Sequence, residues 1–224
     1  ARILDVGAGT GALALRLADR YPSAAITCVD LAHGMARQAR DNLGRTMERL
    51  VAVADAEHLP LRDGVFDLVV STSTFQWLTT LDRAFAEARR VLADDGLFAF
   101  ALFGDGTFKE LKASYRAALH SVPRGGRDRT HRFFTRDEVR AALARAGFRS
   151  VEVFDEDEVE YHPDVPAFLR SVKRIGAGNA SPVAGRGLSG RRVMETMMRT
   201  YAERFGGTDG IPATYTVVYG VGKR

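Results

Sequence analysis

The stretch Ile3–Ala12 constrains the fold of this 224-residue chain more than any other part of the sequence. Its apolar first residues predict a short buried strand, and a leucine-rich helical pattern follows from Ala12. Between them stand glycines at positions 7, 9 and 11. A strand, a glycine-rich turn and a helix in this order are typical of the first unit of a nucleotide-binding α/β fold. Glycine allows the sharp turn and the close approach of a ligand to the main chain.

Asp5 discriminates between two ligand classes for this turn. The spacing Gly7-x-Gly9-x-x-Ala12 also fits a dinucleotide site, which presents its turn to a doubly anionic pyrophosphate. A carboxylate at the mouth would repel pyrophosphate, whereas it would attract the ammonium and sulfonium groups of S-adenosylmethionine (SAM). The pattern Asp-x-Gly-x-Gly-x-Gly resembles the first motif of the class I SAM-dependent methyltransferases. A dehydrogenase stays the weaker alternative, because no catalytic His or Tyr-Lys set and no second substrate domain is evident.

Two further strands also end in an acidic residue. Ala25–Asp30 reads as the second strand, and its final carboxylate has the spacing that suits ribose hydroxyls. Leu50–Asp55 reads as the third, and its final carboxylate suits the amino group of adenine. The exit of the fourth strand, Phe66–Ser71, should face the transferred group. We therefore expect a cofactor-binding set that consists of Asp5, Gly7, Ala8, Gly9, Gly11, Asp30, Leu31, Asp55, Ala56, Glu57, Ser71 and Ser73.

Strands alternate with helices as far as Phe103, which predicts a parallel sheet built from βαβ units. A turn at Asp94–Gly96 is expected to precede the fifth strand. Thr135 and Glu138 have the spacing of a capping box and predict the start of a later helix. A sixth strand is expected to begin at Val151 and to run into the acidic stretch at residues 155–160. We predict an α/β, Rossmann-like class I methyltransferase fold with a seven-stranded, mostly parallel sheet and an antiparallel last strand. A helical insertion at about 163–206 would separate the last two strands. The chain is expected to form a single domain over 1–224, with a SAM-binding half at 1–103 and a substrate-binding half at 104–224.

Composition limits the class of protein further. Hydrophobic residues make up 46% of the chain, which suffices for a full core, and no apolar run approaches the ~18 residues of a membrane span. The single cysteine, Cys28, excludes a disulfide framework and a cysteine-based zinc site, and it fits a reducing cytoplasm. We therefore predict a cytoplasmic protein without a metal centre. The chain enters a strand at once, with no signal peptide, which suggests that the natural protein is longer upstream.

The net charge of +4 is unevenly distributed. Residues 1–100 hold 11 basic against 13 acidic side chains, and residues 101–224 hold 21 against 15. The basic half suits an anionic carrier or substrate, although a solvated arginine-rich surface would look the same. Nucleic acid is not expected, because the chain has no Asp/Asn-Pro-Pro-aromatic motif and Cys28 lacks a preceding proline.

Short motifs, most of them in the second half, narrow the interpretation to one family of methyltransferases. They are Phe75-Gln76-Trp77, Leu111-x-x-Ser114, Arg132-Phe133-Phe134, Phe168-Leu169-Arg170-x-x-Lys173-x-Ile175-Gly176-Ala177 with Asn179, Gly187-Leu188-Ser189-Gly190, and Gly210-Ile211-Pro212-Ala213-Thr214-Tyr215 followed by Tyr219-Gly220. With them, nearly the whole chain resembles the malonyl-acyl-carrier-protein O-methyltransferases of early biotin synthesis. The resemblance implies methyl transfer from SAM to the free carboxylate of a malonyl thioester, with an acyl carrier protein as partner.

The residue chemistry is compatible with that reaction. A carboxylate is already a nucleophile at neutral pH, so no general base and no certain catalytic residue is needed. Arg132 is the candidate for holding the substrate carboxylate, because guanidinium matches carboxylate geometry. Gln76 and Trp77 are expected to line the pocket, and His131 adjoins Arg132. The candidates for docking the carrier protein are basic helix residues: Arg170, Lys173, Arg174, Arg191 and Arg192.

Two alternatives stay open at this point. The protein would be a SAM-dependent methyltransferase that acts on a free small molecule, such as a carboxylic acid or a quinone precursor. Alternatively, it would bind SAM without catalysing any reaction. The motifs do not separate these possibilities, whereas turnover with and without a carrier protein does.

Overall fold

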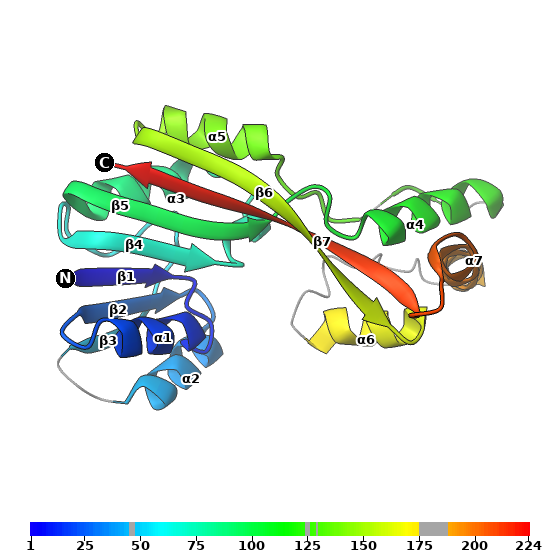
Figure 1. Ribbon diagram of the computed structural model, residues 1–224, viewed down its shortest axis with the longest axis horizontal. Helices are drawn as coiled ribbons and strands as arrows, with labels where there is room; N and C mark the ends of the chain where they lie inside the picture. Colours follow the sequence, from blue (N-terminus) through cyan, green and yellow to red (C-terminus); the bar gives the residue numbers. More distant parts are fainter. Residues whose placement is uncertain (45–47, 124–125, 129, 175–187) are drawn as a thin grey trace. The chain divides into compact units, whose positions relative to one another are not determined.

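The structure is a computed structural model that describes residues 1–44, 48–123, 126–128, 130–174 and 188–224. Among these residues, seven strands form one sheet in the order β3-β2-β1-β4-β5-β7-β6 (Figure 1). The strands are β1 (Arg2–Val6), β2 (Ala25–Asp30), β3 (Arg49–Val53), β4 (Phe66–Thr72), β5 (Leu92–Phe103), β6 (Arg149–His162) and β7 (Ile211–Lys223). The helices are α1 (Ala12–Arg20), α2 (His33–Leu43), the short 3₁₀ helix η1 (Phe75–Trp77), α3 (Asp82–Val91), α4 (Lys109–Ser121), α5 (Arg136–Arg145), α6 (Val165–Arg174) and α7 (Leu188–Phe205).

The strand directions confirm the predicted fold class. β1 pairs in parallel with β2 and β4, and the parallel pairing continues to β3 and β5. β7 runs antiparallel between β5 and β6 (Figure 1). The predicted helical insertion corresponds to α6 and α7, which separate β6 from β7 in the chain. The connecting residues 175–187 lie outside the described residues, and with them the motif positions Ile175, Gly176, Ala177, Asn179 and Gly187.

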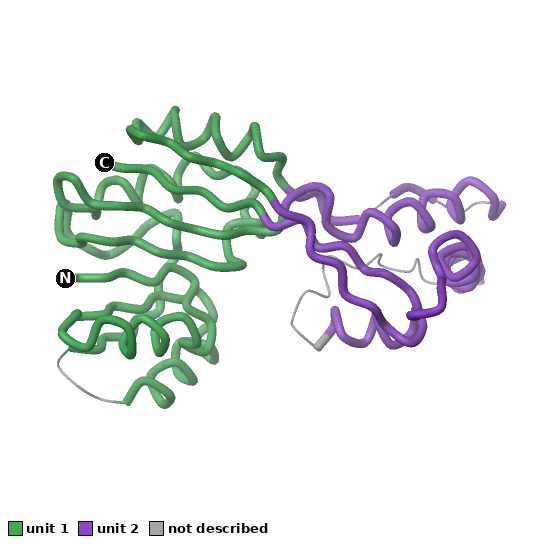
Figure 2. Tube along the Cα trace, in the orientation of Figure 1, with its two compact units in different colours: residues 1–103, 134–155, 218–224 green, residues 104–133, 156–217 purple. Residues whose placement is uncertain are grey.

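The described chain divides into two compact units (Figure 2). Unit 1 comprises residues 1–103, 134–155 and 218–224, and unit 2 comprises residues 104–133 and 156–217. Strands β6 and β7 therefore contribute residues to both units. The organisation as a single domain with a SAM-binding and a substrate-binding half stays a prediction.

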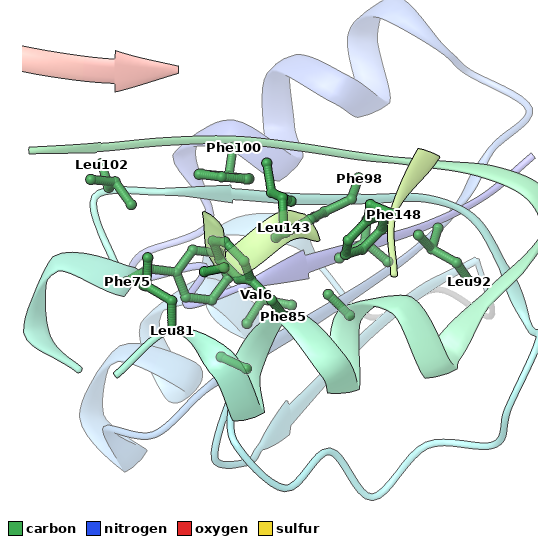
Figure 3. Close-up of a cluster of buried hydrophobic side chains, with 14 of the residues drawn as sticks. Val6, Phe75, Leu81, Phe85, Leu92, Phe98, Phe100, Leu102, Leu143 and Phe148 are labelled. Carbon is green, nitrogen blue, oxygen red and sulfur yellow. The ribbon is translucent and has the colours of Figure 1, made fainter. Parts of the chain in front are cut away.

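An aromatic cluster forms the core of unit 1 on one face of the sheet (Figure 3). Phe98 and Phe100 of β5 contact Phe85 of α3, and Phe75 of η1 lies edge-on to Phe85 with ring centroids 5.4 Å apart. Helix α3 contributes because its apolar residues recur at helical spacing and so share one face. Since Phe75 is fully buried in this cluster, the core fixes the segment that leaves β4. Helices α1 and α2 supply apolar side chains to a separate cluster, together with Ile3 of β1.

The predicted turn at Asp94–Gly96 is wrong. β5 runs without interruption from Leu92 to Phe103. Its register against β4 shifts between the pairs Phe66–Leu92 and Leu68–Leu97. An advance of two residues along β4 is therefore matched by five along β5, and Asp95 has a φ of +64°. The turn-forming residues are thus absorbed as a bulge within the strand.

Two local expectations at α5 and β6 have clear outcomes. Thr135 begins α5 with the predicted capping box: its side chain accepts from the Glu138 N–H, and the Glu138 side chain accepts from the Thr135 N–H. The sequence predicts a sixth strand that begins at Val151 and runs into the acidic stretch at residues 155–160. In the structure this stretch is part of β6, which extends to His162.

The carboxy-terminal motif forms a set of buried links in unit 2. The Thr214 hydroxyl donates to Glu110 of α4 at 2.5 Å, and the Tyr201 hydroxyl of α7 donates to the Pro212 carbonyl at 2.6 Å. Gly210 has a φ of +103°, and a Cβ atom there would lie 2.2 Å from the carbonyl oxygen of His162. The motif therefore joins β7 to two helices through polar contacts and one close backbone approach.

Replacing Gly210 by alanine should destabilise the protein by about 2 kcal/mol or more, since the new methyl group meets backbone at an unfavourable φ. Gly207 in the same turn is a matched control, because a Cβ atom there would have no neighbour within 4 Å. Thermal unfolding of Gly210→Ala and Gly207→Ala, followed by circular dichroism, compares the two. Equal melting temperatures would contradict the steric argument.

Candidate functional site

The loop that follows β1 is held by the end of β2. Gly7, Gly9 and Gly11 all have positive φ values, of 70°, 55° and 84°. The N–H groups of Gly7 and Ala8 both donate to the Val29 carbonyl of β2, at 2.8 and 3.0 Å. Left-handed backbone at alternate positions is accessible to glycine at little cost, and this explains why the sequence repeats it here.

The three glycines have different surroundings. A Cβ atom on Gly9 would have no neighbour within 4 Å, so the main chain is open to an approaching ligand. A Cβ atom on Gly11 would lie 3.4 Å from Ala39 and Leu43 of α2, so this glycine admits a neighbouring helix. A Cβ atom on Gly7 would collide with the Thr74 side chain at 2.1 Å. The loop is therefore packed at both ends and open in the middle.

Thr74 is a residue that the sequence interpretation missed. Its hydroxyl lies 3.2 Å from the Gly7 carbonyl and 3.1 Å from that of Thr72, as donor to both. The preceding Ser73 has a φ of +53°, and its N–H donates to the Ala101 carbonyl at 2.9 Å. These contacts tie the exit of β4 to the glycine loop. A polar residue two positions beyond a strand gives no sequence signal for this role.

Asp5 is a buried carboxylate without a partner in the described structure. Its side chain is 1% exposed, and no described residue forms a hydrogen bond to either carboxylate oxygen. Burial, and secondly the charge of Asp30, raise the pKa of Asp5 to about 7. Its register neighbour Cys28 has a thiol pKa raised to about 12, by burial and by the Asp5 charge. A cation close to Asp5 would lower this pKa and favour the ionised form.

Asp30 serves the loop through both of its oxygens. One accepts from the Gly9 N–H and the other from the Ala32 N–H, each at 2.8 Å. A carboxylate oxygen can accept more than one hydrogen bond, so Asp30 keeps capacity toward a ligand. The next residue, Leu31, is 72% exposed, which places an apolar side chain beside this carboxylate.

Asp55 and Ser71 complete the set of strand-end polar groups. One Asp55 oxygen accepts from the Glu57 N–H at 2.9 Å, and the other lies 3.6 Å from Nδ1 of His58. The Ser71 hydroxyl is fully buried and donates to the Val6 carbonyl at 2.7 Å. Unit 1 therefore contains every residue of the predicted cofactor-binding set, at or just beyond the carboxyl ends of β1 to β4.

The predicted substrate residues fall in both units. Gln76 is buried and Trp77 is 39% exposed, and both lie in η1 of unit 1. Arg132 is exposed and His131 is half-buried, and both belong to unit 2. The His131 ring stands edge-on to Phe133, with centroids 4.8 Å apart.

The predicted carrier residues lie on α6 and α7. Arg170 and Lys173 are exposed on α6, and Arg191 and Arg192 are exposed on α7. Arg191 pairs with Glu195 at 2.9 Å, whereas the other three form no ion pair with a described residue. The side chain of Arg174 lies outside the described residues. Among the described residues, no group of three or more His, Cys, Asp or Glu is placed to hold a metal ion.

Comparisons with known proteins give a consistent result. The family model described as "Methyltransferase domain" matches residues 4–100. The chain is 40% identical to a malonyl-[acyl-carrier protein] O-methyltransferase of Laribacter hongkongensis, over 98% of this chain and 74% of that protein. It is 37% identical to the enzyme of the same name from Methylovorus sp., over 97% of this chain and 73% of that protein. Among solved structures, the YcgJ protein of Bacillus subtilis superposes with a TM-score of 0.66 at 18% identity, covering 100% of this chain and 91% of that one.

None of the described helices has the length and apolar character that crossing a membrane would require.

The buried carboxylate of Asp5 should make the ligand-free protein less stable as the pH rises. Because its folded pKa is raised, the stabilisation that it contributes is complete below its ordinary value of 3.8 and is lost as the pH rises to about 7. At about pH 8, ligand-free Asp5→Asn should therefore be more stable than the wild type, by roughly 2–4 kcal/mol. Thermal unfolding over this pH range measures the difference. The exposed Asp19→Asn is the control, and an Asp5→Asn advantage that does not grow with pH would contradict the argument.

Proposed function

The chain belongs to the family of malonyl-[acyl-carrier protein] O-methyltransferases, and we propose that it methylates the free carboxylate of malonyl-acyl carrier protein with SAM as donor. The structural observation that supports this proposal is the buried carboxylate of Asp5, which has no hydrogen-bond partner among the described residues and lies beside an open glycine loop. A buried anion of this kind favours a cationic ligand, and SAM is one. We propose that this reaction belongs to biotin synthesis. We also propose that it takes place in the cytoplasm, because the single, unpaired Cys28 fits a reducing compartment.

When bound, SAM supplies an electrophilic methyl group attached to a positively charged sulfur. Asp5 would receive the ammonium group of the ligand, and a cation there would lower the pKa of Asp5, so that binding and ionisation favour each other. Asp30 would accept from the ribose hydroxyls with its remaining lone pairs, while its present bonds hold Gly9 in place. Leu31 would offer its exposed side chain to the adenine ring, and Asp55 would accept from the adenine amino group.

The reaction requires positioning more than proton transfer. A malonyl carboxylate is ionised at neutral pH and can attack the methyl group without a general base. The residues must therefore orient one carboxylate oxygen and keep water away. Arg132 would hold the second oxygen, and Gln76 and Trp77 would line the space next to the transferred group. The product is a neutral ester, which no longer attracts a cation.

The decisive experiment supplies methyl-labelled SAM to the full-length protein with malonyl-acyl carrier protein. Malonyl-coenzyme A, acetyl-acyl carrier protein and free malonate are assayed in parallel. We expect a base-labile methyl ester on malonyl-acyl carrier protein and none on the acetyl form, because the acetyl form lacks the free carboxylate. Transfer only to free acids or quinone precursors would replace the proposed substrate. SAM binding without any transfer would favour a non-catalytic SAM-binding protein.

Carrier recognition is proposed to involve the basic side chains of α6. Replacing Arg170 and Lys173 together by glutamine should raise KM for malonyl-acyl carrier protein several-fold and flatten its dependence on salt, because exposed charges mainly steer association. KM for malonyl-coenzyme A should change much less. Steady-state kinetics at two salt concentrations measure both effects. Arg199→Gln on α7 is the control, since this exposed arginine lies 3.9 Å from Glu203, and an equal effect of both changes would argue against the α6 surface.

A further inference from the structure

Lys112 is a half-buried cation in the first turn of α4. Its Nζ atom donates to the main-chain carbonyl of Asp105 at 3.0 Å and lies 4.8 Å from the centre of the Phe133 ring. Burial lowers its pKa, while the carboxylates of Asp105 and Asp128 act in the opposite direction. Neither of these carboxylates, nor any other described one, lies within ion-pair distance of the ammonium group.

The other cations on the same helix are compensated. Lys109 pairs with Asp157 at 2.9 Å, and Arg116 pairs with Asp128 at 2.8 Å. Asp128 is also occupied by Thr130, whose N–H and hydroxyl both donate to it. Lys112 lies between these two pairs along α4, and its partners among the described residues are a neutral carbonyl and an aromatic face. An ammonium group that loses water without gaining an anion destabilises the folded protein. A functional role would account for such a group at this position.

The surroundings of Lys112 favour an anionic ligand. Phe133 is 2% exposed, and its ring contacts both the ammonium group of Lys112 and the ring of His131. Asp128 contacts α4 through Arg116, and Phe133 contacts the same helix through Lys112. The intervening Arg132 is the residue that we expect to hold the substrate carboxylate. The contact between Lys112 and Phe133 therefore places this ammonium group beside the chain neighbour of Arg132.

We infer that Lys112 binds the free carboxylate of the malonyl group and so helps to select an acidic acyl chain. This inference rests on the proposed function and names a further residue for it. An incoming carboxylate would provide the anion that Lys112 lacks. Methylation neutralises that carboxylate, so the same contact would favour the acid substrate over the ester product and promote product release.

Binding measurements test this without depending on turnover. Malonyl-pantetheine and its methyl ester are titrated into the full-length protein in the presence of S-adenosylhomocysteine, and calorimetry gives both affinities. The wild type should prefer the acid by about tenfold or more, as expected of a hydrogen bond to a charged group. Lys112→Met should lose most of this preference, and Lys112→Arg should restore it. Lys109→Met, three residues earlier on the same helix, is the matched control and should leave the preference unchanged.

Kinetics give a second readout that a purely structural role would not change. Since burial lowers the pKa of Lys112, the wild-type KM for malonyl-acyl carrier protein should rise at alkaline pH as the ammonium group loses its proton. The charges that act on this group are those of Asp105, Arg116 and Asp128. Lys112→Arg should keep its charge and flatten the profile. SAM affinity should be unchanged in every Lys112 variant.

The outcomes separate the two proposals. If the wild type methylates malonyl-acyl carrier protein while Lys112→Met keeps both the acid preference and the wild-type pH profile, the assignment of Lys112 is overturned and the function stands. If the wild type shows no methyl transfer but prefers the acid through Lys112, the function fails and the carboxylate site stands. If the wild type shows no preference for the acid, the assignment of Lys112 is overturned.

Discussion

The burial of one carboxylate without a described partner is the constraint on which the site in unit 1 depends. Asp5 lies opposite Cys28 and Val70 in the centre of the parallel sheet, so strands on both sides shield it from water. Asp30 adds a second negative charge and holds the open Gly9 through its N–H. Such an arrangement is unfavourable in the free protein, and only a cationic ligand converts it into an attraction. The glycine loop is held beside Asp5 by the contact of Gly9 with Asp30 and by that of Gly7 with Thr74 at the exit of β4.

The same reasoning applies to unit 2 with the opposite sign. Lys112 is half-buried and lacks an anion among the described residues, while Lys109 and Arg116 on the same helix each have one. Among the described residues, Lys112 is therefore the exception among the cations of α4. Asp5 is a similar exception in unit 1, because the nearby Asp30 accepts hydrogen bonds from two N–H groups and Asp5 accepts none. The proposed reaction brings together a cationic methyl donor and an anionic acceptor. Asp5 offers a negative charge for the methyl donor, and Lys112 offers a positive charge for the acceptor. Each is expected to be stabilised when its ligand binds.

The sequence predicted the parts of the fold that local rules govern. Alternation of strands and helices, the glycine spacing and the capping box at Thr135 depend on neighbours in the chain, and each is found in the structure. The residues at Asp94–Gly96 favour a turn and a bulge equally, and only pairing with β4 decides between them. Thr74 was not predicted, since its role depends on Gly7, which lies far away in the sequence. That Lys112 has no ion pair with a described residue likewise becomes evident only once Asp128 is seen to bind Arg116.

The carboxy-terminal motif at residues 210–215, one of those that carry the family resemblance, forms a set of internal contacts in the structure. Thr214 binds the buried Glu110, Pro212 accepts from Tyr201, and Gly210 allows the backbone of His162 to approach. Links of this kind are specific because each partner would be left buried and unsatisfied if the other were changed. They hold α4 and α7 to β7, and α4 is the helix that carries Lys112. The Gly210–Tyr215 motif can therefore be typical of one enzyme family without contacting the substrate. It holds in place α4, the helix that carries the proposed binding residue Lys112.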